Sequence, residues 1–218
     1  MSIKMSNIFL LRRLHSLTGV VPVGVFLIVH LYTNFAVVKG ADNFNKAVQN
    51  LRVTLPGPLL PMAEILLIGL PILFHALLGI YIAHTMRSNV TSYSYARNWL
   101  YFFQRVAGVV LFFFIAAHVA TMRFGLFGHL SVDHHVYDPV NTPYTIVRDA
   151  LQNPFVLAFY IIGILASAYH LSYGLWSFAI HWGITVREEA QKNFQWVCAA
   201  VGVGVATLGV VSALTFVK

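Results

Sequence analysis

Residues 25–32 read VFLIVHLY, a run of apolar side chains interrupted by the imidazole of His30. The run belongs to a longer apolar window over residues 14–38. About 20 mostly apolar residues cross a bilayer as a helix, so this window predicts a membrane span. An ionisable side chain inside a span is costly and usually functional. His30 therefore needs a partner that offsets its burial.

Four more windows have the same character, at residues 62–86, 100–123, 154–182 and 194–217. The chain of 218 residues is 58% hydrophobic and 10% charged, whereas a soluble domain carries about 25% charged residues. We therefore expect an all-α membrane protein with five transmembrane helices, forming one integral membrane domain over residues 1–218. Residues 39–61 and 124–153 are expected to be outer loops.

The formal net charge of +7 does not indicate nucleic-acid binding, because the basic residues gather at the ends of spans and not in a stripe with aromatic side chains. With the N-terminus inside, the inner side holds eight Lys and Arg residues and the outer side six. This bias favours a cytoplasmic N-terminus. Cys198 is the one cysteine, so no internal disulfide forms, and no CxxCH motif for covalent haem is present.

The first span resembles the third, and the second resembles the fourth. HALLG at 75–79 in the second span matches HLSYG at 170–174 in the fourth. GVVPVGVFLIVH at 19–30 in the first matches GVVLFFFIAAH at 108–118 in the third, which is one residue shorter. The fifth span has no histidine.

The spacing of four histidines from the charged span ends predicts two pairs at two depths. His30 and His118 fall near the outer face, and His75 and His170 fall roughly 12 Å deeper toward the inside at the rise of an α-helix. Each pair draws one histidine from each of two spans. An interhelical hydrogen bond or a proton relay is the alternative role for any one of them.

Two histidines from facing helices suit a haem iron better than a bare metal ion. Zinc and copper normally take three or four protein ligands, while the porphyrin leaves only two axial positions. Gly79 and Gly174, four residues after His75 and His170, would let a flat macrocycle approach the backbone. Ligation by two imidazoles leaves no open site on iron, which suits electron transfer. We expect the first four spans to form a di-haem four-helix bundle.

Candidate partners for haem propionates lie near the inner boundary. Arg13 and Arg105 would pair with a carboxylate, and His15 could donate a hydrogen bond to it. The alternatives are snorkelling arginines and a plain interfacial histidine. Arg12, His84 and His181 occupy similar positions.

Glu64 is the one acidic residue inside a predicted span. Its distance from His75 along the helix puts it near the expected level of His30, where it would exchange protons with a quinone. A carboxylate that faces headgroups is the alternative. Three histidines of the 124–153 loop are expected to be exposed to solvent, and a metal site is the alternative: His129, His134 and His135.

Several long motifs resemble one known family: RRLHSLTGVVPVGVFLIVHL (12–31), PILFHALLGIYIAH (71–84), YSYARNWLYFFQRVAGVV (93–110), AAHVATMR (116–123) and YHLSYGLWSFAIHWGIT (169–185). They are similar to the membrane anchor of succinate dehydrogenases and fumarate reductases, and most of all to the single-chain, five-helix, two-haem cytochrome b of the Bacillus type. The resemblance covers nearly the whole chain, but only loosely the 124–153 loop and the last span.

The resemblance implies two b haems. His75 and His170 would hold the proximal, high-potential haem nearer the cytoplasm, and His30 and His118 the distal, low-potential haem. It also implies a flavoprotein with covalent FAD and an iron–sulfur protein on the cytoplasmic face of a bacterial membrane. Electrons would pass from succinate through these subunits and the haems to quinone, typically menaquinone, or in reverse in a fumarate reductase.

Two features depart from related fumarate reductases. A glutamate two residues before the last haem histidine, proposed there for a proton path, is Ala168 here. Glu64 does not align with their outer glutamate. Two other functions compete with this interpretation: a di-haem cytochrome b of a hydrogenase or formate dehydrogenase, and a haem-free transporter lined by histidines.

Overall fold

The computed structural model describes residues 5–54, 58–85, 88–125 and 142–218. No described residue belongs to a β-strand. Five helical segments are long and apolar enough to cross a membrane: Ile8–Lys39, Leu59–Thr85, Ala96–Met122, Pro154–His181 and Glu188–Val217. Each overlaps one predicted window over nearly its whole length. The prediction of an all-α membrane protein with five spans is therefore confirmed.

The first two spans are not regular α-helices throughout. The first is built from α1 (Met5–Thr18), the π-helical turn η1 (Gly19–Gly24), α2 (Val25–Phe35) and the 3₁₀ turn η2 (Ala36–Lys39). The second is built from α4 (Leu59–Ala63), the π-helical turn η3 (Glu64–Gly69) and α5 (Leu70–Thr85).

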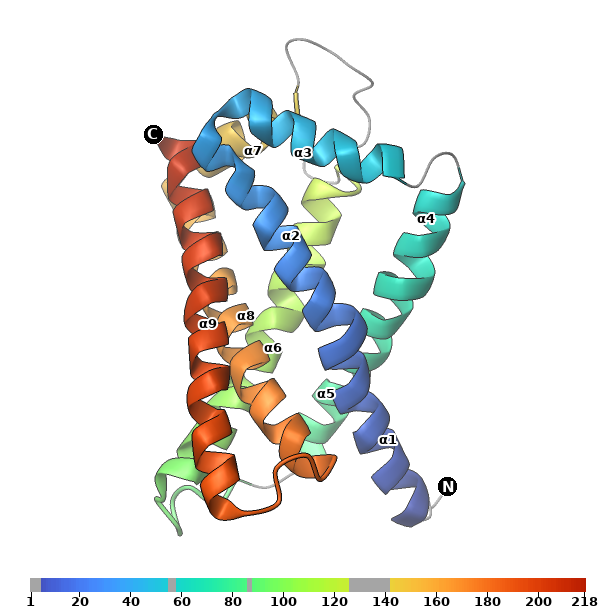
Figure 1. Cartoon of the computed structure of the whole chain (residues 1–218), viewed down its shortest axis with the longest axis vertical. Coiled ribbons are helices and arrows are strands. Elements are labelled where there is room, and N and C mark those ends of the chain that lie inside the picture. The colour runs from blue at the N-terminus through green and yellow to red at the C-terminus, as the bar shows by residue number, and fades with distance from the viewer. Residues whose placement is uncertain (1–4, 55–57, 86–87, 126–141) are drawn as a thin grey trace. The chain divides into compact units, whose positions relative to one another are not determined.

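A proline accompanies both wide turns. Pro22 lies inside η1, and Pro71 follows η3 by two residues. Proline has no amide hydrogen, and its ring clashes with the carbonyl four residues before it. A π turn relieves that clash without ending the helix, because it widens the hydrogen-bond ladder. Both spans consequently stay helical on either side of the wide turn. Figure 1 shows them as the blue ribbon of α1 and α2 and the teal ribbon of α4 and α5.

The other three spans are unbroken helices: α6 (Ala96–Met122), α8 (Pro154–His181) and α9 (Glu188–Val217). A glycine ends α8. Gly183 has a φ of +71°, its amide bonds to the Ile180 carbonyl at 3.1 Å, and the Ile184 amide bonds to the Ala179 carbonyl at 2.8 Å. This pair of bonds is the Schellman motif, which only a left-handed residue closes. The motif reverses the chain within a short turn before α9.

Two expected loops contain helices, so that part of the prediction is wrong. Residues 39–61 include α3 (Ala41–Thr54), and residues 124–153 include α7 (Pro143–Leu151). Both are amphipathic: α3 buries Phe44, and α7 buries Ile146 and Leu151. α3 packs on α7, and Phe44 and Leu151 join one core cluster with Phe216 of α9. The polar residues of both segments predicted loops, but one apolar stripe is enough to form a surface helix.

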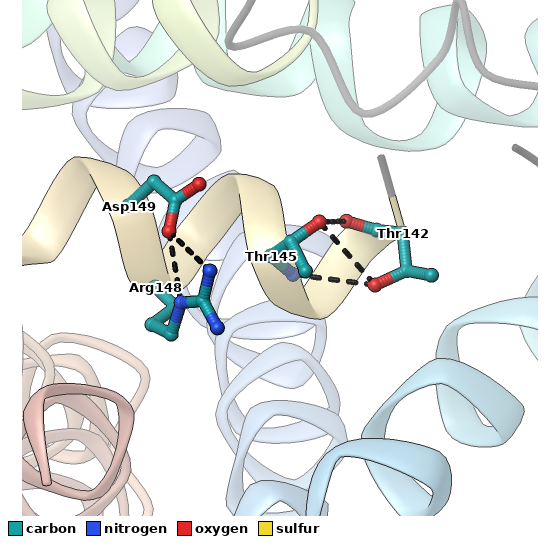
Figure 2. A network of polar contacts seen from close by, with 4 residues as sticks. All are labelled: Thr142, Thr145, Arg148 and Asp149. Atoms are coloured by element: carbon teal, nitrogen blue, oxygen red, sulfur yellow. Dashed lines mark hydrogen bonds and ion pairs between the residues drawn. The ribbon is translucent and has the colours of Figure 1, made fainter. Parts of the chain in front are cut away.

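A side-chain cap fixes the start of α7. Thr142 is extended, and its hydroxyl oxygen accepts a hydrogen bond from the Thr145 amide at 3.3 Å. The Thr145 hydroxyl donates in return to the Thr142 carbonyl at 2.9 Å. Figure 2 shows this cap and, one turn on, the ion pair of Arg148 with Asp149. The first amide groups of α7 thus find an acceptor outside the helix.

The chain divides into two compact units. Unit 1 comprises Met1–Leu27, Pro61–Val109 and Ala168–Val203, and in it α1 and η1 pack against α5. Unit 2 comprises Ile28–Leu60, Val110–Ser167 and Gly204–Lys218. Its core is formed by Val37, Phe44, Leu151, Ile164, Ala213 and Phe216. That all of these segments form one domain stays a prediction.

Candidate haem-binding site

Unit 1 contains the pair of histidines that was predicted at the deeper level. His75 lies on α5 and His170 on α8. Their ring centroids are 6.0 Å apart, and the ring planes are nearly perpendicular at 87°. Both side chains are half-buried among apolar helices. The structure thus brings together two imidazoles that are 95 positions apart in the sequence.

Unit 2 contains the other predicted pair. His30 lies on α2 and His118 on α6. Their ring centroids are 5.9 Å apart, and the ring planes meet at 75°. The two pairs, found in separate units, therefore have nearly the same internal geometry.

This spacing suits one iron held between two imidazoles. A metal–imidazole bond is about 2.0 Å, and the ring centroid lies roughly 1 Å behind the bonding nitrogen, so the centroids should be about 6 Å apart. Among the described residues, no group of three or more His, Cys, Asp or Glu side chains could hold a metal ion. The geometry therefore favours a centre that needs two protein ligands.

The Nδ1 atoms of three of these histidines have hydrogen-bond partners that leave Nε2 for a metal. His75 Nδ1 lies 2.8 Å from the His15 carbonyl, and His170 Nδ1 lies 3.2 Å from the Gln104 carbonyl. His118 Nδ1 lies 3.1 Å from the Tyr160 hydroxyl. Histidines that ligate metals usually donate their second ring N–H to an acceptor, which fixes the tautomer and the ring orientation.

His30 has a different polar neighbour. The Asn34 side-chain amide donates to the His30 carbonyl at 2.7 Å, and the same nitrogen lies 3.5 Å from His30 Nε2. The shorter contact is the stronger hydrogen bond, because 3.5 Å is at the outer limit for such bonds. The Asn34 side chain therefore bonds mainly to the main chain of its own helix, at the His30 carbonyl.

Glycines on neighbouring elements receive the two rings of unit 1. A Cβ atom on Gly19 would overlap the His75 ring, and a Cβ atom on Gly108 would lie 3.1 Å from His170 Cε1. Sequence reasoning chose Gly79 and Gly174 instead, which face His15 and the Gln104 amide. Gly19 and Gly108 open the two matching GVV segments, so the sequence also marks the glycines that face these rings. The approach of a macrocycle at Gly79 and Gly174 stays a prediction.

Unit 1 also contains the three residues predicted to bind propionates. The Arg13 guanidinium donates to the His181 carbonyl at 3.2 Å and lies over the Phe9 and Trp182 rings. The His15 ring is stacked on His75 at 4.0 Å, with the planes 10° apart. Arg105 donates to the Ala83 carbonyl near the end of α5.

Four buried polar atoms of unit 1 have no hydrogen-bond partner among the described residues: Arg13 Nε, His15 Nε2, Gln104 Oε1 and Thr185 Oγ1. Leaving such atoms unpaired costs free energy. Two of the four belong to predicted propionate partners, and Gln104 and Thr185 were not predicted from the sequence. The site therefore fits an additional polar group that is not part of this chain.

The other predicted residues have a different standing. Glu64 begins η3 and is half-buried in unit 1, whereas His30 belongs to unit 2, so its expected level stays a prediction. His84 and His181 are exposed at the ends of α5 and α8. His129, His134 and His135 lie outside the described residues.

Known proteins show the family of this chain. Residues 83–208, more than half of the chain, match the family model described as the succinate dehydrogenase/fumarate reductase transmembrane subunit. The chain is 39% identical over 209 residues to the succinate dehydrogenase cytochrome b558 subunit of Bacillus subtilis (strain 168), with 96% of this chain and 97% of that protein covered. The chain therefore belongs to the transmembrane subunits of the succinate dehydrogenase and fumarate reductase family.

Proposed function

We propose that this membrane subunit passes electrons between an iron–sulfur subunit and membrane quinone through two b haems. The observation that carries the proposal is the presence of two histidine pairs, each with ring centroids about 6 Å apart. The relative in Bacillus subtilis is named a cytochrome b558 subunit, which supports haem b as the cofactor. Succinate oxidation belongs to other subunits, since this chain is the membrane anchor.

His75 and His170 would hold one haem, the proximal and high-potential one, and His30 and His118 the distal, low-potential one. Haem b with two axial imidazoles is a one-electron carrier with no open coordination site. The His15 carbonyl accepts the Nδ1 hydrogen of His75, and the Gln104 carbonyl accepts that of His170. Both bonds fix the tautomer that leaves Nε2 available for iron.

Arg13 and His15 would bind the propionates of the haem in unit 1. Each has a buried nitrogen with no hydrogen-bond partner in the described ranges, and a carboxylate would satisfy both with charge-assisted hydrogen bonds. Arg105 would add positive charge, although one of its nitrogens already donates to Ala83.

The partners and location follow from the family. A flavoprotein subunit with FAD and an iron–sulfur subunit would dock on the cytoplasmic face, and the N-terminus would lie on that side of a bacterial cytoplasmic membrane. Menaquinone is the proposed quinone. Glu64, the half-buried acid at the start of η3, is the proposed residue for proton exchange with it.

A reduced-minus-oxidised absorption spectrum of the purified complex tests the proposal. We expect b-type bands from two haems. His75→Ala and His170→Ala should each remove one haem and lower the haem-to-protein ratio by about half, because a single imidazole does not retain six-coordinate haem. The other haem should keep its spectrum, which shows that the variant is folded.

His181→Ala is the matched control, because His181 lies on the same helix as His170 but its side chain is exposed. It should keep both haems, and loss of one would show that the ligand assignment is wrong. A wild-type complex without b-type bands would instead favour the haem-free, histidine-lined transporter. Co-purification with a hydrogenase or formate dehydrogenase in place of a flavoprotein would favour the other alternative.

A further inference from the structure

The two units hold their histidines with different kinds of acceptor. In unit 1, the Nδ1 hydrogens of His75 and His170 go to main-chain carbonyls. In unit 2, His118 Nδ1 instead faces the Tyr160 hydroxyl at 3.1 Å. A carbonyl only accepts hydrogen bonds, whereas a hydroxyl accepts and donates at once. The bond to His118 can therefore be strengthened or weakened by whatever the Tyr160 hydroxyl donates to.

The phenol can accept the His118 Nδ1 hydrogen and still donate its own hydrogen. Among apolar helices, such a bond is electrostatically stronger than the same bond in water.

Packing holds the His118 and Tyr160 rings in place. The Phe114 ring lies nearly parallel to His118, 18° apart at a centroid distance of 5.8 Å, and is 9% exposed. The Tyr160 ring meets His118 at 71°. A Cβ atom on Gly163 would overlap the Phe114 ring, so this glycine gives Phe114 its position. His118 therefore cannot turn away from Tyr160 without displacing a buried aromatic ring.

We propose that Tyr160 is the positioning residue that sets the redox potential of the haem held by His118. This inference rests on the proposed function. A hydrogen bond accepted from Nδ1–H makes the imidazole a stronger electron donor, which favours ferric iron and lowers the midpoint potential. The acceptors in unit 1 are carbonyls, which no side-chain substitution removes.

Tyr160→Phe in the assembled complex tests this role. The ring and its packing remain, while the acceptor for His118 Nδ1–H is lost. One haem should become easier to reduce, with roughly a three- to tenfold change in its oxidised-to-reduced ratio, equal to about 28–59 mV at 59 mV per tenfold. The potential of the other haem should not move. A redox titration followed by absorption measures both.

Tyr169→Phe is the matched control, because it removes a phenol from the same helix whose hydroxyl donates to the Leu100 carbonyl. It should leave both potentials unchanged.

Unchanged potentials in Tyr160→Phe with both haems bound would overturn the inference, as would an equal shift in Tyr169→Phe. Loss of a haem in Tyr160→Phe would also overturn it, because Tyr160 would then be needed to hold the haem and not to set its potential. A wild-type complex without two b haems contradicts the proposed function itself, so the two failures are distinguishable.

Discussion

His15 contributes three times to the surroundings of His75. Its carbonyl accepts the His75 Nδ1 hydrogen, and its ring lies nearly parallel to the His75 ring. Its own Nε2 is buried and has no hydrogen-bond partner in the part of the chain that the structure describes. One residue of α1 thus fixes the tautomer, blocks one face of the ring and offers a donor to a carboxylate. A substitution of His15 changes the last two contributions but keeps the first, because the carbonyl belongs to the main chain.

Gly19→Ala should disturb the histidine pair of unit 1. The added methyl group would overlap the His75 ring, so the ring or the helix must move, and overpacking of this kind costs roughly 1–3 kcal/mol. We expect a lower content of one haem or a shifted absorption band, with the other haem unaffected. Gly204→Ala is the control, since a Cβ atom there would meet open space. Normal spectra in Gly19→Ala would contradict this role.

The sequence predicted the four histidines of the two pairs but not the groups that hold them. The histidines stand out because imidazoles are rare in apolar spans. Their acceptors in unit 1 are carbonyls of residues 60 and 66 positions away. Every residue carries a carbonyl, so no residue type marks one as an acceptor. Only the fold shows which of them faces an imidazole.

At the scale of elements, the spans were predictable and the surface helices were not. A span is recognised from a long apolar run that needs no knowledge of its neighbours. α3 and α7 are recognised only from a narrow apolar stripe, which has meaning once a partner covers it. The Tyr144 amide of α7 donates to the Asn45 side chain of α3 at 2.9 Å, so each helix also completes the polar contacts of the other.

Thr142→Ala should loosen the start of α7. The substitution removes the hydroxyl oxygen that accepts the Thr145 amide (Figure 2), and loss of such a cap costs about 0.5–2 kcal/mol. We expect faster hydrogen exchange at the first amide groups of α7, measured by mass spectrometry, with little change in α8. Thr54→Ala is the control, because its hydroxyl only bonds back to the Asn50 carbonyl at the end of α3. Equal protection in both variants would show that the cap has no effect.

At the scale of the whole molecule, five spans put successive connections on alternating sides of the membrane. The short turn before α6 should lie in the cytoplasm, and α3 should lie outside. Cys198 is the one cysteine of the sequence, so a Cys198→Ala background leaves no native thiol in this chain to react. Single cysteines at Ser94, in that turn, and at Gln49, on α3, are both at exposed positions. They test the topology without altering a span.

A membrane-impermeant maleimide applied to intact cells should label Gln49→Cys and leave Ser94→Cys unlabelled. Ser94→Cys should react after the cells are broken, which shows that its thiol is accessible. In a Gram-negative host, the outer membrane is first permeabilised. The reverse pattern would invert the proposed orientation and would place the docking face for the flavoprotein and iron–sulfur subunits on the other side.

The π turn η1 has an evolutionary consequence. Gly19 and His30 are separated by one residue more than Gly108 and His118, which occupy matching places in the third span. A π turn holds one residue more than an α turn, so η1 can take up the surplus residue without ending the helix. We infer that the longer first span is tolerated for this reason. Relatives whose first span is one residue shorter should have a regular α-helix there.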